Sequence, residues 1–180
     1  MTIRTYQGST PKLGEGVFVD PTAVVMGDVE LAEGVSVWPM AVVRGDMHKI
    51  RIGKATSVQD GAVLHITHAS DFNPDGFPLI IGEEVTIGHK AILHGCTLSN
   101  RILVGMGAIV MDGVTVEDEV IIAAGALVAP GKTLCSGYVY AGNPARKMRE
   151  ITEKERAFFS YSAANYVALQ AKHRAEGWTE

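Results

Sequence analysis

Histidine is the residue type in this sequence whose number and spacing point to catalytic chemistry. Six histidines are present, and three of them, His65, His89 and His94, lie within a regular stretch of the chain. Neutral imidazole is a common ligand of transition metals, and a three-histidine centre leaves one coordination position for water. A catalytic metal centre is therefore the first hypothesis. Ordinary turn and surface histidines are the alternative.

An aliphatic residue recurs every six positions through most of the chain, and this repeat determines how the histidines are placed. Six residues accommodate one short strand and a turn, whereas an α-helix requires a period near 3.6. Three hexads form one turn of a parallel β-helix, and successive turns stack through backbone hydrogen bonds. We therefore predict a mostly β protein with a hexapeptide β-helix over about residues 11–142; a Gly-rich antiparallel sandwich is the alternative. The repeat begins with Leu13, Val19, Val25, Leu31, Val37 and Val43.

The repeat predicts that His65 and His94 are stacked. Two insertions interrupt it, at residues 44–49 and at roughly residues 67–78. Removing the eleven residues of the second insertion from the 29-residue interval between His65 and His94 leaves 18, or one turn. Neighbouring strands lie about 4.8 Å apart, so the two imidazoles could share one ion. His89 falls near a corner or on another face, where a neighbouring chain packed against the same face could supply it; cyclic threefold symmetry allows such a contact to close.

A change of period marks the end of the β-helix, and we expect a helical segment over about residues 144–176. Residues 145–151 follow a proline and are expected to form a short helix. Residues 152–155 read as a capping box, which predicts a long helix ending near Arg174. This helix can cover one face of the β-helix. We expect one domain over residues 1–180.

Composition and charge exclude several functional classes. The chain has 180 residues, of which 47% are apolar and 20% charged, as expected for a folded domain. A net charge of −4, with scattered Lys and Arg, argues against nucleic-acid binding. The absence of a long apolar run or a signal sequence predicts a cytoplasmic protein with no membrane partner. Cys96 is expected to be a buried small residue rather than a redox switch.

The residues in five segments resemble the γ-class carbonic anhydrases and their bacterial homologues. The resemblance covers nearly the whole chain. It implies a left-handed β-helix and a homotrimer in which metal-bound hydroxide, at a subunit interface, hydrates CO2 reversibly to bicarbonate. Zn²⁺ is the expected metal, and Fe²⁺ or Co²⁺ are alternatives. The five segments are Arg44-Gly45-Asp46, Val58-Gln59-Asp60-Gly61, Val63-Leu64-His65, Ile87-Gly88-His89-Lys90 and Leu93-His94-Gly95-Cys96.

The same resemblance implies roles for individual residues near the metal. His65, His89 and His94 match the metal ligands of the family. Gln59 matches a residue that hydrogen-bonds the metal-bound water. Tyr166, on the predicted long helix, is a candidate for the pocket, and a packing role is the alternative.

Other matched positions concern the subunit contact and proton transfer. Arg44, Asp46 and Asp60 match an ionic cluster that links subunits, for which a purely structural role is the alternative. The sequence departs from the family at positions that look like acidic proton shuttles, where it has Met47 and His68. Methionine cannot carry a proton, whereas histidine titrates near pH 6.5. His68 is therefore the candidate shuttle, with a solvated loop histidine as the alternative, and the departure puts efficient hydration in doubt.

Three other functions stay open on the sequence alone. Hexapeptide acyltransferases share the β-helix, and Gly142-Asn143-Pro144-Ala145 looks like the segment that closes many of them. They need one histidine as general base, so three histidines favour metal chemistry. A thioesterase acting on coenzyme A esters would use the same metal site. A non-catalytic metal-binding scaffold would keep the trimer with little turnover.

Overall fold

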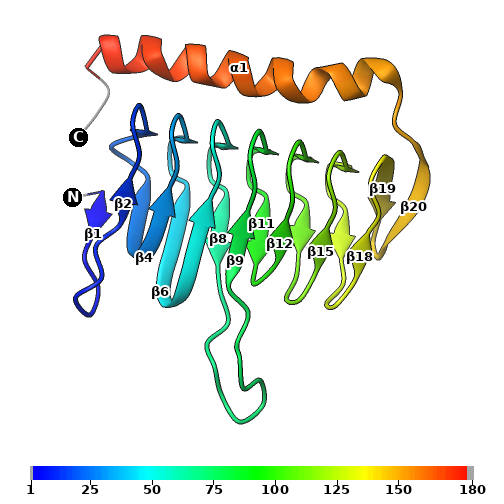
Figure 1. The fold of residues 1–180 in the computed structure, drawn as a ribbon, viewed down its shortest axis with the longest axis horizontal. Coiled ribbons are helices and arrows are strands. Elements are labelled where there is room, and N and C mark those ends of the chain that lie inside the picture. The colour runs from blue at the N-terminus through cyan, green and yellow to red at the C-terminus, as the bar shows by residue number, and fades with distance from the viewer. Residues whose placement is uncertain (1, 178–180) are drawn as a thin grey trace.

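The chain forms a parallel β-helix followed by one long α-helix, as the hexad repeat predicts (Figure 1). The computed structural model describes residues 2–177. Each turn contributes short strands to three faces, and from Val19 to Leu134 the inward residue of each hexad is a buried aliphatic side chain. Leu13, in the first hexad, is the exception and is 46% exposed. Stacking equal side chains in successive turns gives a narrow continuous core, in which each buried aliphatic contributes about 1.5–3 kcal/mol.

The first face, here called the helix face, is covered by the C-terminal helix. Its strands form a separate sheet that is parallel except for its last member. The strands are β3 (Phe18–Val19), β5 (Ser36–Val37), β7 (Ser57–Val58), β10 (Thr86–Ile87), β13 (Leu103–Val104), β16 (Ile121–Ile122), β19 (Tyr138–Gly142) and β20 (Ala145–Glu150).

The other two faces belong to one sheet, because two long strands bend from one face onto the other. These strands are β4 (Val24–Leu31) and β6 (Val42–Ile52). Their first halves lie on the aliphatic face, together with β1 (Ile3–Arg4), β8 (Val63–His65), β11 (Ile92–His94), β14 (Ile109–Val110) and β17 (Leu127–Val128). Their second halves lie on the polar face, together with β2 (Lys12–Leu13), β9 (Leu79–Ile81), β12 (Thr97–Leu98), β15 (Thr115–Val116) and β18 (Thr133–Leu134).

The short helix predicted for residues 145–151 is wrong. The segment is strand β20, which pairs antiparallel with β19. Without β20, the backbone groups of β19 would form an open sheet edge, and satisfying them outweighs the weak helical preference of a short charged segment. Lys147 also packs over the ring of Tyr138, with its Nζ 3.5 Å from the ring centroid. The strand therefore closes one end of the β-helix.

Helix α1 (Glu153–Ala175) starts at the predicted capping box and runs back along the length of the β-helix (Figure 1). Thr152 is its N-cap: the Thr152 hydroxyl accepts from the backbone N–H of Glu155, and the Glu155 carboxylate accepts from the backbone N–H of Thr152. Near the far end of the helix, the amide of Gln170 donates to the carbonyls of Gly16 and Gly34 at 3.2 and 3.1 Å. The helix thus links the last strands to the first turns.

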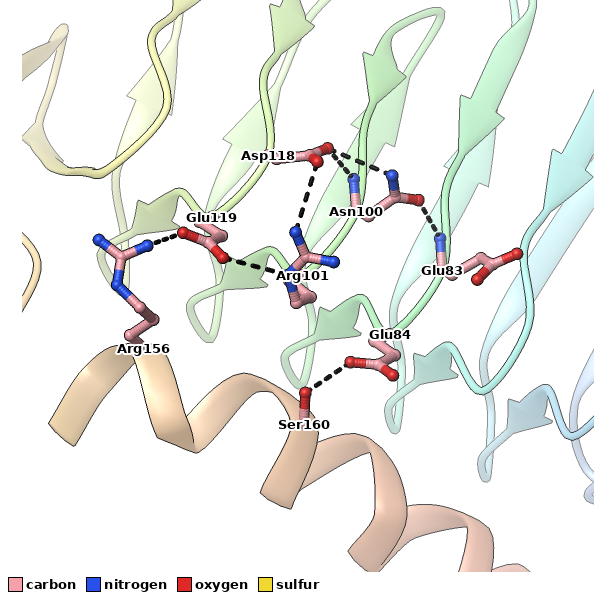
Figure 2. Close-up of polar contacts among 8 residues, drawn as sticks. All are labelled: Glu83, Glu84, Asn100, Arg101, Asp118, Glu119, Arg156 and Ser160. Carbon is pink, nitrogen blue, oxygen red and sulfur yellow. Dashed lines mark hydrogen bonds and ion pairs between the residues drawn. The ribbon is translucent and has the colours of Figure 1, made fainter. Parts of the chain in front are cut away.

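Polar contacts also fix the helix to one corner of the β-helix (Figure 2). Arg156 pairs with Glu119, which also accepts from Arg101 at 3.2 Å. One helical turn further on, Ser160 donates to Glu84 at 2.7 Å. These contacts hold the helix over the corner rather than leaving it to slide on the apolar surface. Within residues 2–177, α1 is too polar to qualify as a membrane-spanning helix.

Candidate metal centre

His65 and His94 lie side by side at the end of the aliphatic face. Strands β8 and β11 pair in parallel with His94 directly opposite His65. The Nδ1 atom of His65 lies 3.0 Å from the Nε2 atom of His94. Two nitrogens bound at about 2.1 Å to one tetrahedral ion are about 3.4 Å apart. A small rotation of the two rings would therefore accommodate a shared ion.

A carboxylate holds the outer nitrogen of each ring. The Nε2 atom of His65 lies 3.2 Å from Oδ1 of Asp46. The Nδ1 atom of His94 lies 2.6 Å from Oδ1 of Asp112. Carboxylates in this position orient a metal-binding imidazole and raise its basicity. Both rings are therefore arranged as metal ligands are.

The two carboxylates are themselves fixed. Arg44 donates to the second oxygen of Asp46 at 2.5 Å, and Thr67 donates to the second oxygen of Asp112 at 2.8 Å. Burial opposes ionisation of Asp46, but hydrogen bonds from Arg44 and His65 outweigh it and lower its pKa. Burial lowers the pKa of His65, which favours the neutral form that binds metals.

The hydrogen count of this row supports a cation between the rings. Asp46, His65, His94 and Asp112 make three consecutive contacts, and each contact needs one hydrogen. Two neutral imidazoles carry two hydrogens in total. Two neutral imidazoles therefore leave one contact, the one between the facing nitrogens, without a hydrogen. A metal ion at that place would bind both facing nitrogens, and its charge would balance the two carboxylates.

His89 lies apart from the pair, in the turn between β10 and β11. Its Nδ1 atom lies 2.9 Å from Oδ2 of Asp60, and its side chain is 46% exposed. Its Nε2 atom has no hydrogen-bond partner within residues 2–177. Across the same residues, no group of three or more His, Cys, Asp or Glu could hold a metal. A complete three-histidine centre therefore requires more than one chain.

Gln59 and Tyr166 accompany His89 rather than the histidine pair. All three line a groove of about 450 Å³ between helix α1 and the β-helix. Gln59 is only 5% exposed. Burial raises the pKa of the Tyr166 hydroxyl, and the negative charge of Asp60 adds to this effect. Tyr166 therefore stays protonated at neutral pH.

The remaining predicted residues divide between these two regions. Arg44 and Asp46 form an ion pair beside His65, whereas Asp60 pairs with His89. Within one chain, Asp60 is therefore separate from the other two members of the predicted ionic cluster. His68 lies exposed on the loop after β8, three residues beyond His65. Its role as a proton shuttle stays a prediction.

Sequence reasoning missed Asp112. It lies 18 residues after His94, which is one turn of the β-helix, so the same count that paired the histidines could have found it. Gly95 is the reason that it approaches so closely. A Cβ at Gly95 would lie 2.4 Å from Oδ1 of Asp112 and 2.6 Å from Cβ of Phe77, and its φ is +50°. Glycine alone fits there.

Cys96 is 1% exposed, as its predicted role requires. Burial raises the pKa of its thiol far above the usual value. The thiol is therefore protonated and unreactive, which leaves Cys96 as a core residue.

Comparisons with known proteins identify the family of this chain. The family described as bacterial transferase hexapeptide (six repeats) matches residues 10–45. Protein YrdA of Escherichia coli is 50% identical over 97% of this chain and 95% of its own length. A carbonic anhydrase of Geobacillus kaustophilus is 36% identical over 85% of this chain and 80% of its own. Relatives named carbonic anhydrase or gamma carbonic anhydrase reach 43% identity. The chain belongs to the γ-class carbonic anhydrase-like family.

This γ-class carbonic anhydrase-like chain also matches solved structures with other names. The crystal structure of a hexapeptide transferase family protein from Anaplasma phagocytophilum superposes with a TM-score of 0.88 at 39% identity. The match covers 96% of this chain and 98% of that one. The family and its fold are thus established, and the γ carbonic anhydrase relatives imply a metal cofactor.

Proposed function

We propose that the protein is a metal-dependent enzyme that hydrates CO2 reversibly to bicarbonate, at a site between subunits of a cytoplasmic homotrimer. The observation that carries this proposal is the matched set of three histidines, each with one nitrogen held by a carboxylate. His65 and His94 supply two ligands, and His89 of the next subunit supplies the third. A set of this kind serves metal chemistry and has no evident use in an acyltransferase.

A stripe of aliphatic side chains supports the assembly. On the aliphatic face, the outward residues of six strands lie in register, and all are aliphatic and partly or largely exposed. Two of them, Val63 and Ile92, precede the two histidines by two residues and are 39% and 37% exposed. An apolar surface of this length favours association with a second copy. The stripe consists of Val24, Val42, Val63, Ile92, Ile109 and Leu127.

The donor set fits the expected metals. Three neutral imidazoles suit Zn²⁺, and Fe²⁺ or Co²⁺ are the alternatives, with availability in the cell deciding between them. The chemistry that a bound Zn²⁺ supplies is the acidification of a water molecule, from a pKa of about 15.7 to near 7.

The chain's own residues would provide orientation and proton removal. Asp46, Asp112 and Asp60 hold the three imidazoles in the ligand tautomer. Gln59 is buried beside His89, so its neutral amide can orient a water or CO2 molecule without adding charge. His68 can accept the released proton because it lies exposed on the loop that follows His65.

The sharpest test mixes two inactive variants. His65→Ala and His89→Ala are each expected to lose bound metal and CO2 hydration. When the two are co-expressed in equal amounts, a site is intact where a His89→Ala chain supplies the pair and a His65→Ala chain supplies His89. Random threefold assembly makes about a quarter of the sites intact. We expect metal content and hydration to recover to about that fraction of the wild-type value.

A matched pair controls this experiment. His65→Ala mixed with His94→Ala removes both ligands from the same half of the site, so no combination of chains restores it. Recovery in neither mixture would contradict the shared site. Recovery of metal without CO2 hydration would contradict the carbonic anhydrase activity and favour the scaffold or another hydrolase.

A further inference from the structure

The loop between β8 and β9 carries an aromatic residue near its middle that none of the described residues covers. Phe72 is 100% exposed. The loop is nevertheless held in shape, because backbone hydrogen bonds join Thr67 to Phe77 at 3.0 and 2.8 Å and Ser70 to Asn73 at 2.9 and 3.0 Å. Figure 1 shows it projecting well beyond the β-helix, on the side away from α1. An ordered loop that displays a whole phenylalanine is typical of a contact surface.

The groove beside His89 has the size and the apolar lining that an aromatic side chain such as Phe72 would need. Its lining is mainly apolar and is formed by strands of the helix face and by residues 158–166 of α1. Its volume of about 450 Å³ lies in the range of about 300–1,000 Å³ that ligand pockets occupy, so an aromatic ring fits within it. The apolar lining includes Leu103, Val104, Met106, Ile121 and Phe158.

The proposed site brings this loop and this groove together. The loop begins directly after His65, and the groove opens at His89. Any assembly in which His89 of one chain meets the His65–His94 pair of the next therefore places the root of the loop beside the mouth of the groove. Phe72 lies five residues beyond Thr67, so it can reach at most about 17 Å from the root of the loop.

Charge at the two surfaces is complementary. Asp71 adjoins Phe72 on the loop, and Lys90 adjoins His89 at the mouth of the groove. Both side chains are exposed, and neither forms an ion pair with another of the described residues. Opposite charges at the rim of an apolar contact help to set its register.

We propose that Phe72 of one subunit packs into the groove beside His89 of the next subunit, so that the loop closes the side of the shared site. The occupant is a second copy of this chain. This inference rests on the proposed assembly, and it explains why the groove is larger than CO2 requires.

Disulfide trapping tests the contact. In a Cys135→Ser background, Phe72→Cys is combined with Met106→Cys in the groove. Mild oxidation is expected to yield covalently linked trimers on a denaturing gel, while Cys96 stays buried and unreactive. Phe72→Cys combined with Met148→Cys is the matched control, because Met148 is 63% exposed against 60% for Met106 and lies on β20, outside the groove. We expect at least tenfold more linked trimer from the first pair.

The outcomes separate this inference from the proposed function. A disulfide within one chain, or equal linkage in both pairs, would overturn the docking of Phe72. No linkage in a protein that is trimeric and binds metal as the wild type does would also overturn it, while leaving the shared site in place. A monomeric protein would contradict both. If docking fails, the groove is free for a substrate with an apolar tail, which hydrolysis of short- and long-chain esters would reveal.

Discussion

The aliphatic face and the polar face are built from the same repeat but present different residues to their surroundings. Apart from Leu13 in the first turn, the inward positions are buried aliphatics on both faces. Outward, the polar face carries charged and hydroxyl side chains, with Ile80 as the exception. Glu30 on this face pairs with Lys12 at 2.8 Å and with Arg51 at 3.3 Å. The outward residues in register are Lys12, Glu30, Arg51, Ile80, Thr97, Thr115 and Thr133.

The difference between the two faces shows that the inward and outward residues of a hexad vary independently. Strand β4 contains both kinds of surface, with Val24 outward at one end and Glu30 outward at the other. The change from apolar to polar happens where the strand turns the corner. The inward residues therefore specify the β-helix, and the outward residues specify which face is available for the proposed contact between subunits.

A charge on the aliphatic face should have the largest effect. Ile92→Glu places three carboxylates in the proposed interface, and burying unpaired charges costs several kcal/mol. We expect the oligomer to dissociate and to lose metal and CO2 hydration together, as measured by light scattering and metal analysis. Thr115→Glu on the polar face is the control and should leave the mass unchanged. Equal behaviour of the two variants would remove the distinction between the faces.

Filling the space at Gly95, at the edge of the aliphatic face, should have the next largest effect on metal binding. Gly95→Ala would force Asp112 and Phe77 apart and so loosen both the His94 ring and the loop. Gly107→Ala is the control, because its φ is similarly positive, at +65°, but nothing lies within 4 Å of the added methyl group. Both changes strain the backbone, and we expect Gly95→Ala alone to weaken metal binding by about 10–100-fold. Similar metal affinities would show that the close approach is unimportant.

Removing the carboxylate behind His94 should weaken metal binding without changing the assembly. Asp112→Asn keeps the shape but loses the charge that orients the imidazole, and we expect a loss of about tenfold in affinity. Competition with a chelator measures this, and light scattering should report an unchanged mass. Asp118→Asn, at the corner shown in Figure 2, should leave metal affinity at the wild-type value. A larger loss at Asp118 would contradict the assignment.

The smallest effect concerns helix α1, which covers the helix face, and the dependence of its stability on pH. The Arg149 side chain and the backbone of Thr152 hold the pKa of Glu155 at about 2, below its usual value of 4.5. The unfolded chain therefore binds this proton more readily, so the stabilisation is complete above about pH 4.5 and is lost as the pH falls towards 2. Circular dichroism of the helix in acid should follow this range. Glu155→Gln should remove that component, whereas Glu153→Gln should retain it.

Much of the fold and half of the site could be predicted from the sequence, because a hexad repeat turns residue number into position. Once the eleven-residue insertion is removed, His65 and His94 fall one turn apart, and the structure pairs them directly. Thr152 and Glu155 likewise predicted the start of the helix, because a capping box depends only on neighbouring residues.

The remaining features depend on contacts that the repeat does not encode. Residues 145–150 form a strand because the edge of β19 needs a partner, and local preference does not show that need. The groove beside Gln59 exists because α1 returns over the helix face at a particular height. The role of Asp46 as a partner of His65 depends on the path of β6 round its corner.

The return of α1 over the β-helix has a consequence for how the molecule unfolds. A stack of repeats with contacts only between neighbours can fray one turn at a time from either end. Here Gln170 is bonded to the first turns, while β20 and the capping box anchor the same helix at the last strands. Loss of either end therefore removes support from the other, and we expect the repeat array to unfold as a single cooperative unit.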